Sequence, residues 1–211
     1  MVGSQNPVFR TMEVLTAFFL LNFVWLISCL PLITILPATK AMFAVLTEWK
    51  EKGISTGVFI PFYKKIKHDF FKNFFLGIIW MGVGTVLYLD ILVLMQMNFP
   101  GSGFVLLLTV FLSLAFLFTS IYLPMMKGQC AVSMVASAKN SFLFSIANLL
   151  HTLWLLLILI FSIFIIYLFP FMLFINISLT AFYFNHVFTR LTNRSRPDMK
   201  LTLLPEGQTQ K

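Results

Sequence analysis

The chain has 211 residues, of which 59% are hydrophobic and 10% charged, and its mean hydropathy is +0.93. A soluble domain of this length cannot bury so much apolar surface, so these values exclude a soluble globular protein and predict a membrane protein. The net charge of +8 does not indicate nucleic-acid binding. The basic residues border apolar stretches, where attraction to anionic lipid headgroups explains them.

The apolar stretches predict five transmembrane helices, since a helix needs roughly 20 apolar residues to cross a bilayer. Three stretches are separate, and Pro31 should bend the first of them. From 142 to 189 the chain stays apolar, which as one helix would be about 70 Å long and would exceed the bilayer. It must therefore reverse, and Pro170 is the natural corner. We expect an all-α integral membrane protein with a single membrane domain, residues 1–211, and spans at about 14–36, 74–95, 104–123, 142–166 and 171–189.

The distribution of Lys and Arg predicts the orientation of these helices. Every basic residue except Arg10 falls between the first and second helices, between the third and fourth, or in the tail 190–211. Basic segments near membrane spans stay in the cytoplasm. We therefore expect the N-terminus outside, the C-terminal tail inside, and a cytoplasmic segment at 38–72.

The cytoplasmic segment 38–72 predicts two amphipathic helices. The first places its apolar residues, including Trp49, on one face, and the second begins at Pro61 and places Phe62 on one side. We expect both to lie flat in the inner headgroup layer, with Trp49 and Tyr63 as interface anchors. Ordinary interfacial helices are one interpretation, and docking onto a cytoplasmic partner is the other. Candidate contacts with lipid or partner are Lys64, Lys65, Lys67, Lys72 and Trp49.

Two short patterns occur twice, in the same order. The pattern L-P-x-x-K-x-x-x-A-V covers 36–45 and 123–132, and K-N-x-F-L covers 72–76 and 139–143. One interpretation is a duplicated two-helix hairpin with the fifth helix appended, because parallel repeats are a known architecture of transport proteins. Coincidence in a chain rich in Phe and Leu is the other.

A stripe of small polar residues leads into the fourth predicted helix. It consists of Ser133, Ser137, Ser141, Ser145 and Asn148. Small residues at about four-residue spacing let helix backbones approach closely in lipid, so close packing is the favoured interpretation. A hydroxyl-lined path for a polar solute is the alternative.

Asp90 and His151 are candidate intramembrane polar residues within the predicted helices. Asp90 is a functional candidate because an acid in a membrane is costly, yet it lies near enough to the outer end to reach the headgroups. His151 lies near an inner end, where a histidine usually bonds a neighbouring helix or a headgroup. No G-x-S-x-G, H-E-x-x-H or P-loop pattern is present, so we expect neither an enzyme nor a metal or cofactor site.

Three segments resemble the YesL-like family, bacterial membrane proteins grouped as a domain of unknown function. They are Pro37–Val45 after the first helix, the aromatic and basic segment 62–76, and Lys139–Asn140, and the resemblance extends over about residues 10–194. It implies the plasma membrane of a bacterium, chiefly a Gram-positive one. Because members are often encoded beside carbohydrate ABC-transporter components, it also implies an accessory or regulatory partner of such a system. A small autonomous transporter or permease is the alternative, and the partners to consider are anionic lipid, transporter subunits and a second copy of the chain.

Overall fold

The computed structural model describes residues 7–54, 57–96, 101–126 and 134–194, and within these ranges every regular element is helical. Six of the helices (α1, α2, α4, α5, α7 and α8) are long and apolar enough to cross a membrane. The all-α prediction is confirmed for the described residues, and the additional apolar helix is α2, in the segment predicted to be cytoplasmic. In chain order the elements are α1 (Pro7–Ser28), η1 (Leu32–Thr34), α2 (Ile35–Lys52), α3 (Phe59–His68), α4 (Phe70–Gln96), α5 (Ser102–Tyr122), α6 (Met134–Ala147), α7 (Leu149–Leu168), η3 (Pro170–Met172) and α8 (Leu173–Arg194).

The predicted first span, 14–36, divides into two helices with a corner between them. α1 ends before Pro31, and η1 leads from the corner into α2. Trp25 Nε1 donates a hydrogen bond to Thr39 Oγ1 at 3.2 Å. Further from the corner, the rings of Phe18 and Trp49 lie 5.7 Å apart, so the two helices run antiparallel. Pro31 thus reverses the chain where we had expected a bend, because it lacks an N–H and disfavours helical backbone at the residue before it.

α2 is the most buried of the six apolar helices. In an 18-residue apolar stretch that includes most of α2, 44% is buried inside the protein, against 22% or less in the corresponding stretch of the other five helices. Its neighbours are α1, α3, α4 and α8. The face that we expected to meet the headgroups lies in the core, and its buried residues are Met42, Val45, Leu46 and Trp49. An apolar stripe has the same periodicity whether it contacts lipid or protein, so the pattern alone does not separate the two cases.

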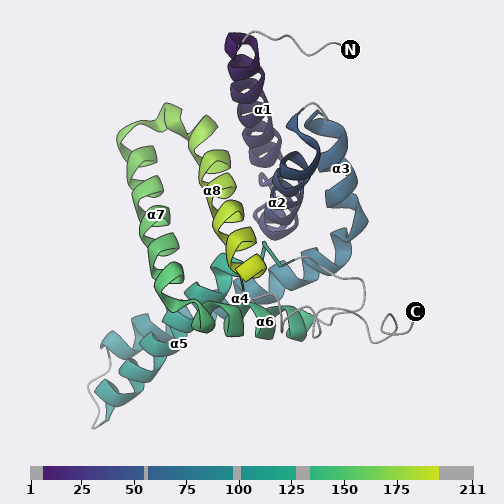
Figure 1. Ribbon diagram of the computed structural model, residues 1–211. Helices are drawn as coiled ribbons and strands as arrows, with labels where there is room; N and C mark the ends of the chain where they lie inside the picture. Colours follow the sequence, from purple (N-terminus) through teal and green to yellow (C-terminus); the bar gives the residue numbers. More distant parts are fainter. Residues whose placement is uncertain (1–6, 55–56, 97–100, 127–133, 195–211) are drawn as a thin grey trace.

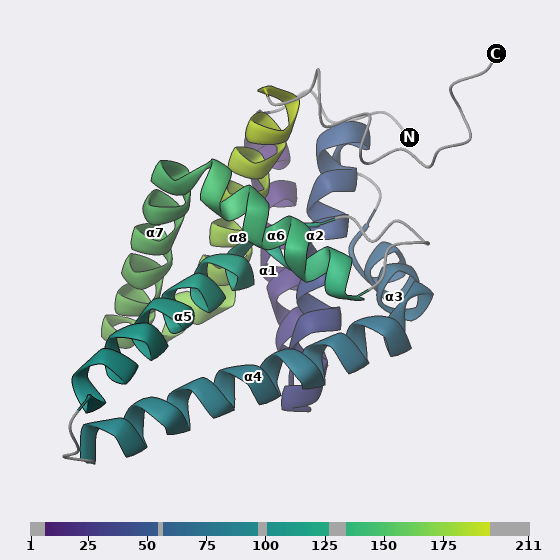
Figure 2. The same ribbon diagram turned by 90° about the horizontal axis from the view of Figure 1, so that it is seen from below.

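α4 and α5 form a long antiparallel hairpin. Trp80 Nε1 donates to Ser120 Oγ at 2.8 Å, and the Trp80 ring stacks on Phe116 with centroids 4.6 Å apart. The connected ends of the two helices extend away from the rest of the molecule (Figures 1 and 2). The predicted spans 74–95 and 104–123 fall on these two helices, with α4 beginning slightly earlier and 104–123 running one residue past the end of α5.

The predicted fourth span, 142–166, contains a break. α6 ends and α7 begins on either side of Asn148, whose backbone leaves the helical region at φ −122° and ψ 44°. Its side-chain Nδ2 donates to the carbonyl oxygen of Phe144 at 3.2 Å, and such local bonds compete with helix continuation. α6 consequently runs at a large angle to α7 (Figure 1). At the other end of α7 the chain reverses at Pro170, where we expected the corner.

Polar side chains join α8 to α1 and to α7. Asn22 Nδ2 in α1 donates to the carbonyl oxygen of Leu173 at 2.7 Å. Asn176 Nδ2 in α8 donates to Ser162 Oγ in α7 at 2.8 Å. Bonds of this kind hold helices together in lipid, where apolar packing supplies little preference for one face over another.

The two copies of each repeated pattern lie at different places in the fold. Residues 36–45 lie within α2, whereas the second copy begins at the end of α5 and continues beyond Met126, outside the described residues. Residues 72–76 lie in the first turns of α4, and 139–143 lie within α6. The duplicated hairpin therefore stays a prediction.

Gly77 in α4 provides a test of this packing, because it lies against the segment that joins α1 to α2. A Cβ at this position would lie 3.2 Å from Leu36 Cβ and 3.5 Å from the Ile33 carbonyl oxygen. We expect Gly77→Val to lower the free energy of unfolding by about 1–3 kcal/mol, the usual cost of forcing extra atoms into a packed contact. Unfolding in detergent micelles measures this. Gly82→Val is the control, since a Cβ there meets nothing within 4 Å, and equal stability of the two variants would contradict the contact.

Candidate functional site

A pocket of about 770 Å³ lies between α2, α3, the first turn of α4 and the turn 124–126 after α5. Its volume falls within the range of small-molecule sites, about 300–1,000 Å³. Apolar side chains such as Phe43, Ile60 and Met125 line it together with several charged ones. A mixed lining of this kind is typical of binding sites, so this α2–α3 pocket is the candidate functional site.

Lys40 reaches the pocket from α2 and is half-buried. Its Nζ donates to Asn73 Oδ1 at 2.8 Å, a contact that joins α2 to α4. An ammonium group removed from water needs hydrogen-bond acceptors, and a lysine has three donors to satisfy. Asn73 supplies a neutral acceptor for one of them, so Lys40 retains capacity to bind an anion.

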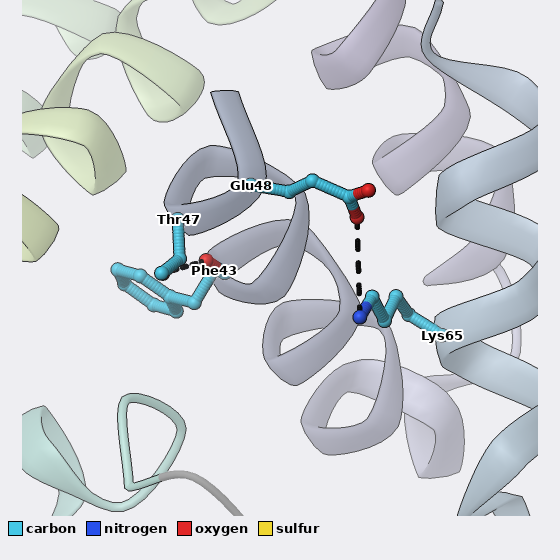
Figure 3. Close-up of polar contacts among 4 residues, drawn as sticks. All are labelled: Phe43, Thr47, Glu48 and Lys65. Atoms are coloured by element: carbon cyan, nitrogen blue, oxygen red, sulfur yellow. Dashed lines mark hydrogen bonds and ion pairs between the residues drawn. The ribbon is translucent and has the colours of Figure 1, made fainter. Parts of the chain in front are cut away.

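Two acidic residues of the pocket lie close to nitrogen atoms of basic side chains. Lys65 Nζ is 3.9 Å from Glu48 Oε2, an ion pair that joins α3 to α2 (Figure 3). His68 Nδ1 is 3.0 Å from Asp69 Oδ2. The Lys65 side chain is 45% exposed, so solvent screens its pair with Glu48 and the contribution to stability is small, about 0–1 kcal/mol. Its main effect is to hold α3 over α2 at the rim of the pocket.

α3 has one face in the core and one in solvent. Phe62 is 2% exposed and packs with the core residues of α2, so α3 is fixed to the body of the protein. The opposite surface combines aromatic, aliphatic and basic side chains, with Ile60 82% exposed. We call this surface the α3 outer face. It consists of Phe59, Ile60, Tyr63, Lys64 and Lys67.

The residues predicted to contact lipid or a partner occupy three kinds of environment. Lys64, Lys65 and Lys67 are exposed on α3, and Lys72 is half-buried in α4. Trp49 is 4% exposed and packs edge-to-face against Phe18, so it is a core residue and cannot serve as an interface anchor. Its apolar ring finds more contact between α1 and α2 than at the headgroups.

The predicted polar stripe lies largely in α6. Ser133 lies outside the described residues. Ser141 and Ser145 are fully buried, and their hydroxyls donate to carbonyl oxygens of their own helix at 2.9 and 2.7 Å. Ser137 is half-buried, and Asn148 separates α6 from α7. Hydroxyls satisfied in this way agree with close helix packing, and the path for a polar solute stays a prediction.

Asp90 and His151 are both exposed and do not line the pocket. Asp90 Oδ2 accepts a hydrogen bond from Thr109 Oγ1 at 2.8 Å, which joins α4 to α5. Over the described ranges, no group of three or more His, Cys, Asp or Glu side chains is placed to hold a metal ion.

The sequence interpretation missed Lys40 and Asn73 as site residues. They are 33 positions apart, so their contact depends on the corner at Pro31 and on the antiparallel return of α2. A signal was nevertheless present, because Lys40 is the lysine of the first repeated pattern and Asn73 the asparagine of the second. Pro124, from the other copy of the first pattern, lines the same pocket.

The packing of α3 predicts a labelling pattern. In a protein with Cys29→Ser and Cys130→Ser, Lys67→Cys should react rapidly with a hydrophilic maleimide. Phe62→Cys should react at least about ten-fold more slowly, because a buried side chain labels only on local opening. Labelling rates of the purified protein in detergent measure this. Similar rates at the two positions, in variants with unchanged unfolding, would contradict the packing of α3 on α2.

Comparison with known proteins points to the same region of the chain. Residues 18–91 match the family described as "Protein of unknown function, DUF624". In Bacillus subtilis (strain 168), the uncharacterized protein YteU is 29% identical over 100 residues, which cover 46% of this chain and 45% of YteU. The uncharacterized protein YesL of the same strain is 29% identical over 106 residues, 49% of this chain and 48% of YesL.

These matches cover about half the length of each relative, and no solved structure matches the chain. The family segment begins within α1 and ends within α4, so it contains α2, α3 and both partners of the Lys40–Asn73 hydrogen bond. The resemblance to the YesL-like family, whose function is unknown, is thus confirmed through the segment that builds most of the α2–α3 pocket.

Proposed function

We propose that this protein is a non-enzymatic membrane protein that acts as an accessory or regulatory partner of a transport system, and that the α3 outer face contacts a cytoplasmic subunit of that system. The proposal rests on the two faces of α3, one packed in the core and one exposed to solvent. The helix is fixed to the core through Phe62, while Ile60 and Tyr63 remain exposed beside lysines. A carbohydrate ABC-type system is the partner that the family resemblance suggests, in the plasma membrane of a bacterium.

The chemistry of the α3 outer face suits a protein partner. Aromatic side chains such as Phe59 and Tyr63 supply contact area at interfaces with little loss of conformational entropy. Lys64 and Lys67 at the border of such a patch would steer an acidic partner and fix its orientation. Anionic headgroups are the competing occupant, since basic and aromatic residues also favour the membrane surface.

We further propose that all six apolar helices cross the membrane, with both termini in the cytoplasm. The antiparallel return of α2, which is long and apolar enough to cross, supports this arrangement. One more crossing than the five predicted from the sequence places the N-terminus on the same side as the C-terminus. With six crossings Arg10 joins the remaining basic segments, and every Lys and Arg except Lys40 within α2 lies on one side. The charge asymmetry then exceeds that of the five-helix arrangement, in which Arg10 is outside.

The position of the N-terminus decides between five and six crossings. A green fluorescent protein fused to the N-terminus should fluoresce in cells if six helices cross, because this reporter fluoresces when it folds in the cytoplasm. The same reporter at the C-terminus is the control, since both arrangements place that end inside. A dark N-terminal fusion, together with a fluorescent and stably expressed C-terminal fusion, would contradict six crossings.

Crosslinking in cells tests the docking of the α3 outer face. After brief crosslinking, the tagged protein is purified in mild detergent and its partners are identified by mass spectrometry. The double variant Lys64→Gln and Lys67→Gln should recover about two- to thirty-fold less of a transporter subunit, since an exposed ion pair contributes about 0.2–1 kcal/mol.

Lys139→Gln is the matched control, because Lys139 is exposed on α6, away from α3. Equal recovery of the subunit by the double variant and the control would contradict docking through this face. Recovery of only further copies of the chain would favour the second candidate function, a small autonomous transporter. The α2–α3 pocket favours that candidate, since a transporter needs a solute site among its membrane helices.

A further inference from the structure

We infer that the α2–α3 pocket is a binding site for a phosphate monoester, with Lys40 as the principal cation and Asn73 as the residue that positions it. The inference does not rest on the proposed docking function. The pocket and the α3 outer face share Ile60 and Lys64, whereas Lys40 and Asn73 belong to the pocket alone, so variants at these two positions test the pocket separately. Each step rests on the residues that line the pocket.

Lys40 has a hydrogen-bond partner but no direct ion pair among the described residues. Its Nζ is bound to the neutral Asn73 Oδ1 at 2.8 Å, and over the described ranges no carboxylate oxygen lies within 4.0 Å of it. A half-buried ammonium that makes no direct ion pair attracts an anion, and binding one restores the interactions that it loses on leaving water. Asn73 fixes the direction of the ammonium group from α4.

The other charged residues of the lining partly balance one another. Lys65 is paired with Glu48, and Asp69 lies beside His68. Lys40 and Lys64 are the lining lysines that have no carboxylate within ion-pair distance among the described residues. The charge of Asp69 also acts on Lys40, where the charge of Lys72 opposes it more strongly, and Glu51 is exposed at the rim. A phosphate monoester carries about −1.5 to −2 charge near pH 7, which the positive charges of two lysines would balance. A ligand with one carboxylate carries only a single negative charge and would balance only one of them.

Part of the pocket lining is apolar. Phe43, Ile60 and Met125 face the same space as the lysines. A volume of about 770 Å³ also exceeds what a bare phosphate needs. The pocket therefore fits a phosphate carried on a larger organic group, which is either the glycerol backbone of a lipid or a soluble metabolite. Basic pockets between membrane helices are known to bind phosphorylated headgroups.

Two probes distinguish a lipid headgroup from a soluble metabolite, because they carry the same phosphate monoester on different molecules. Phosphatidic acid in nanodiscs presents it on a lipid, and glycerol 3-phosphate presents it in solution, with diacylglycerol as the lipid without phosphate. We expect native mass spectrometry of the purified protein to show retained phosphatidic acid, and Lys40→Gln to reduce its affinity at least ten-fold. Lys40→Arg should preserve most of the affinity, and Lys139→Gln, outside the pocket, should leave it unchanged.

Glycerol 3-phosphate identifies the source by competition. Release of phosphatidic acid at millimolar glycerol 3-phosphate would assign the pocket to a soluble phosphate ester, and retention would assign it to the lipid headgroup. Equal affinity of Lys40→Gln and the unchanged protein for phosphatidic acid would overturn the inference, provided the melting temperatures agree. Equal retention of diacylglycerol and phosphatidic acid would overturn it as well. If Lys40→Gln unfolds, Asn73→Leu provides the second test, since it removes the positioning acceptor and leaves the charge.

Discussion

The enclosure of α2 by α1, α3, α4 and α8 is the constraint on which the remaining architecture depends. To bury its apolar stripe, α2 packs antiparallel against α1. The ring contact between Phe18 of α1 and Trp49 of α2 is part of this packing. It also requires a cover on the side away from α1, and α3 supplies that cover through Phe62. The pocket lies beside this packing, between α2, α3, the start of α4 and the turn 124–126.

Polar contacts give the outer helices a definite rotation about their axes. A helix such as α7 is apolar over most of its surface, and dispersion contacts with lipid and protein differ little from face to face. Ser178 Oγ in α8 donates to the Phe18 carbonyl oxygen of α1 at 3.0 Å, and Ser162 Oγ lies 3.1 Å from Thr180 Oγ1. Interhelical hydrogen bonds in membranes contribute about 0.6–2 kcal/mol each, so they favour the rotations that make them.

Composition and hydrophobic length were enough to predict an all-α chain with helices long and apolar enough to cross a membrane, and Pro170 was enough to place the corner between α7 and α8. The corner at Pro31 was not predictable in the same way, because a proline inside an apolar stretch can bend a helix or end it. The break at Asn148 depends on one side chain that competes for a backbone carbonyl. The Lys40–Asn73 contact spans 33 positions, and a single sequence carries no direct signal for such pairs.

A lysine in an apolar helix connects the number of crossings to the chemistry of the pocket. A charged side chain at the centre of a lipid-facing helix costs about 2.5–3.5 kcal/mol on insertion scales. If α2 crosses the membrane, Lys40 must therefore face protein or a water-filled space, and the pocket provides both. The polar side chains of α3 and Asn73 in the pocket lining would then allow α2 to cross the membrane with Lys40 charged, and would also form the ligand site. If α2 remained at the cytoplasmic surface instead, Lys40 could reach water directly, and nothing would require α3 to shield it.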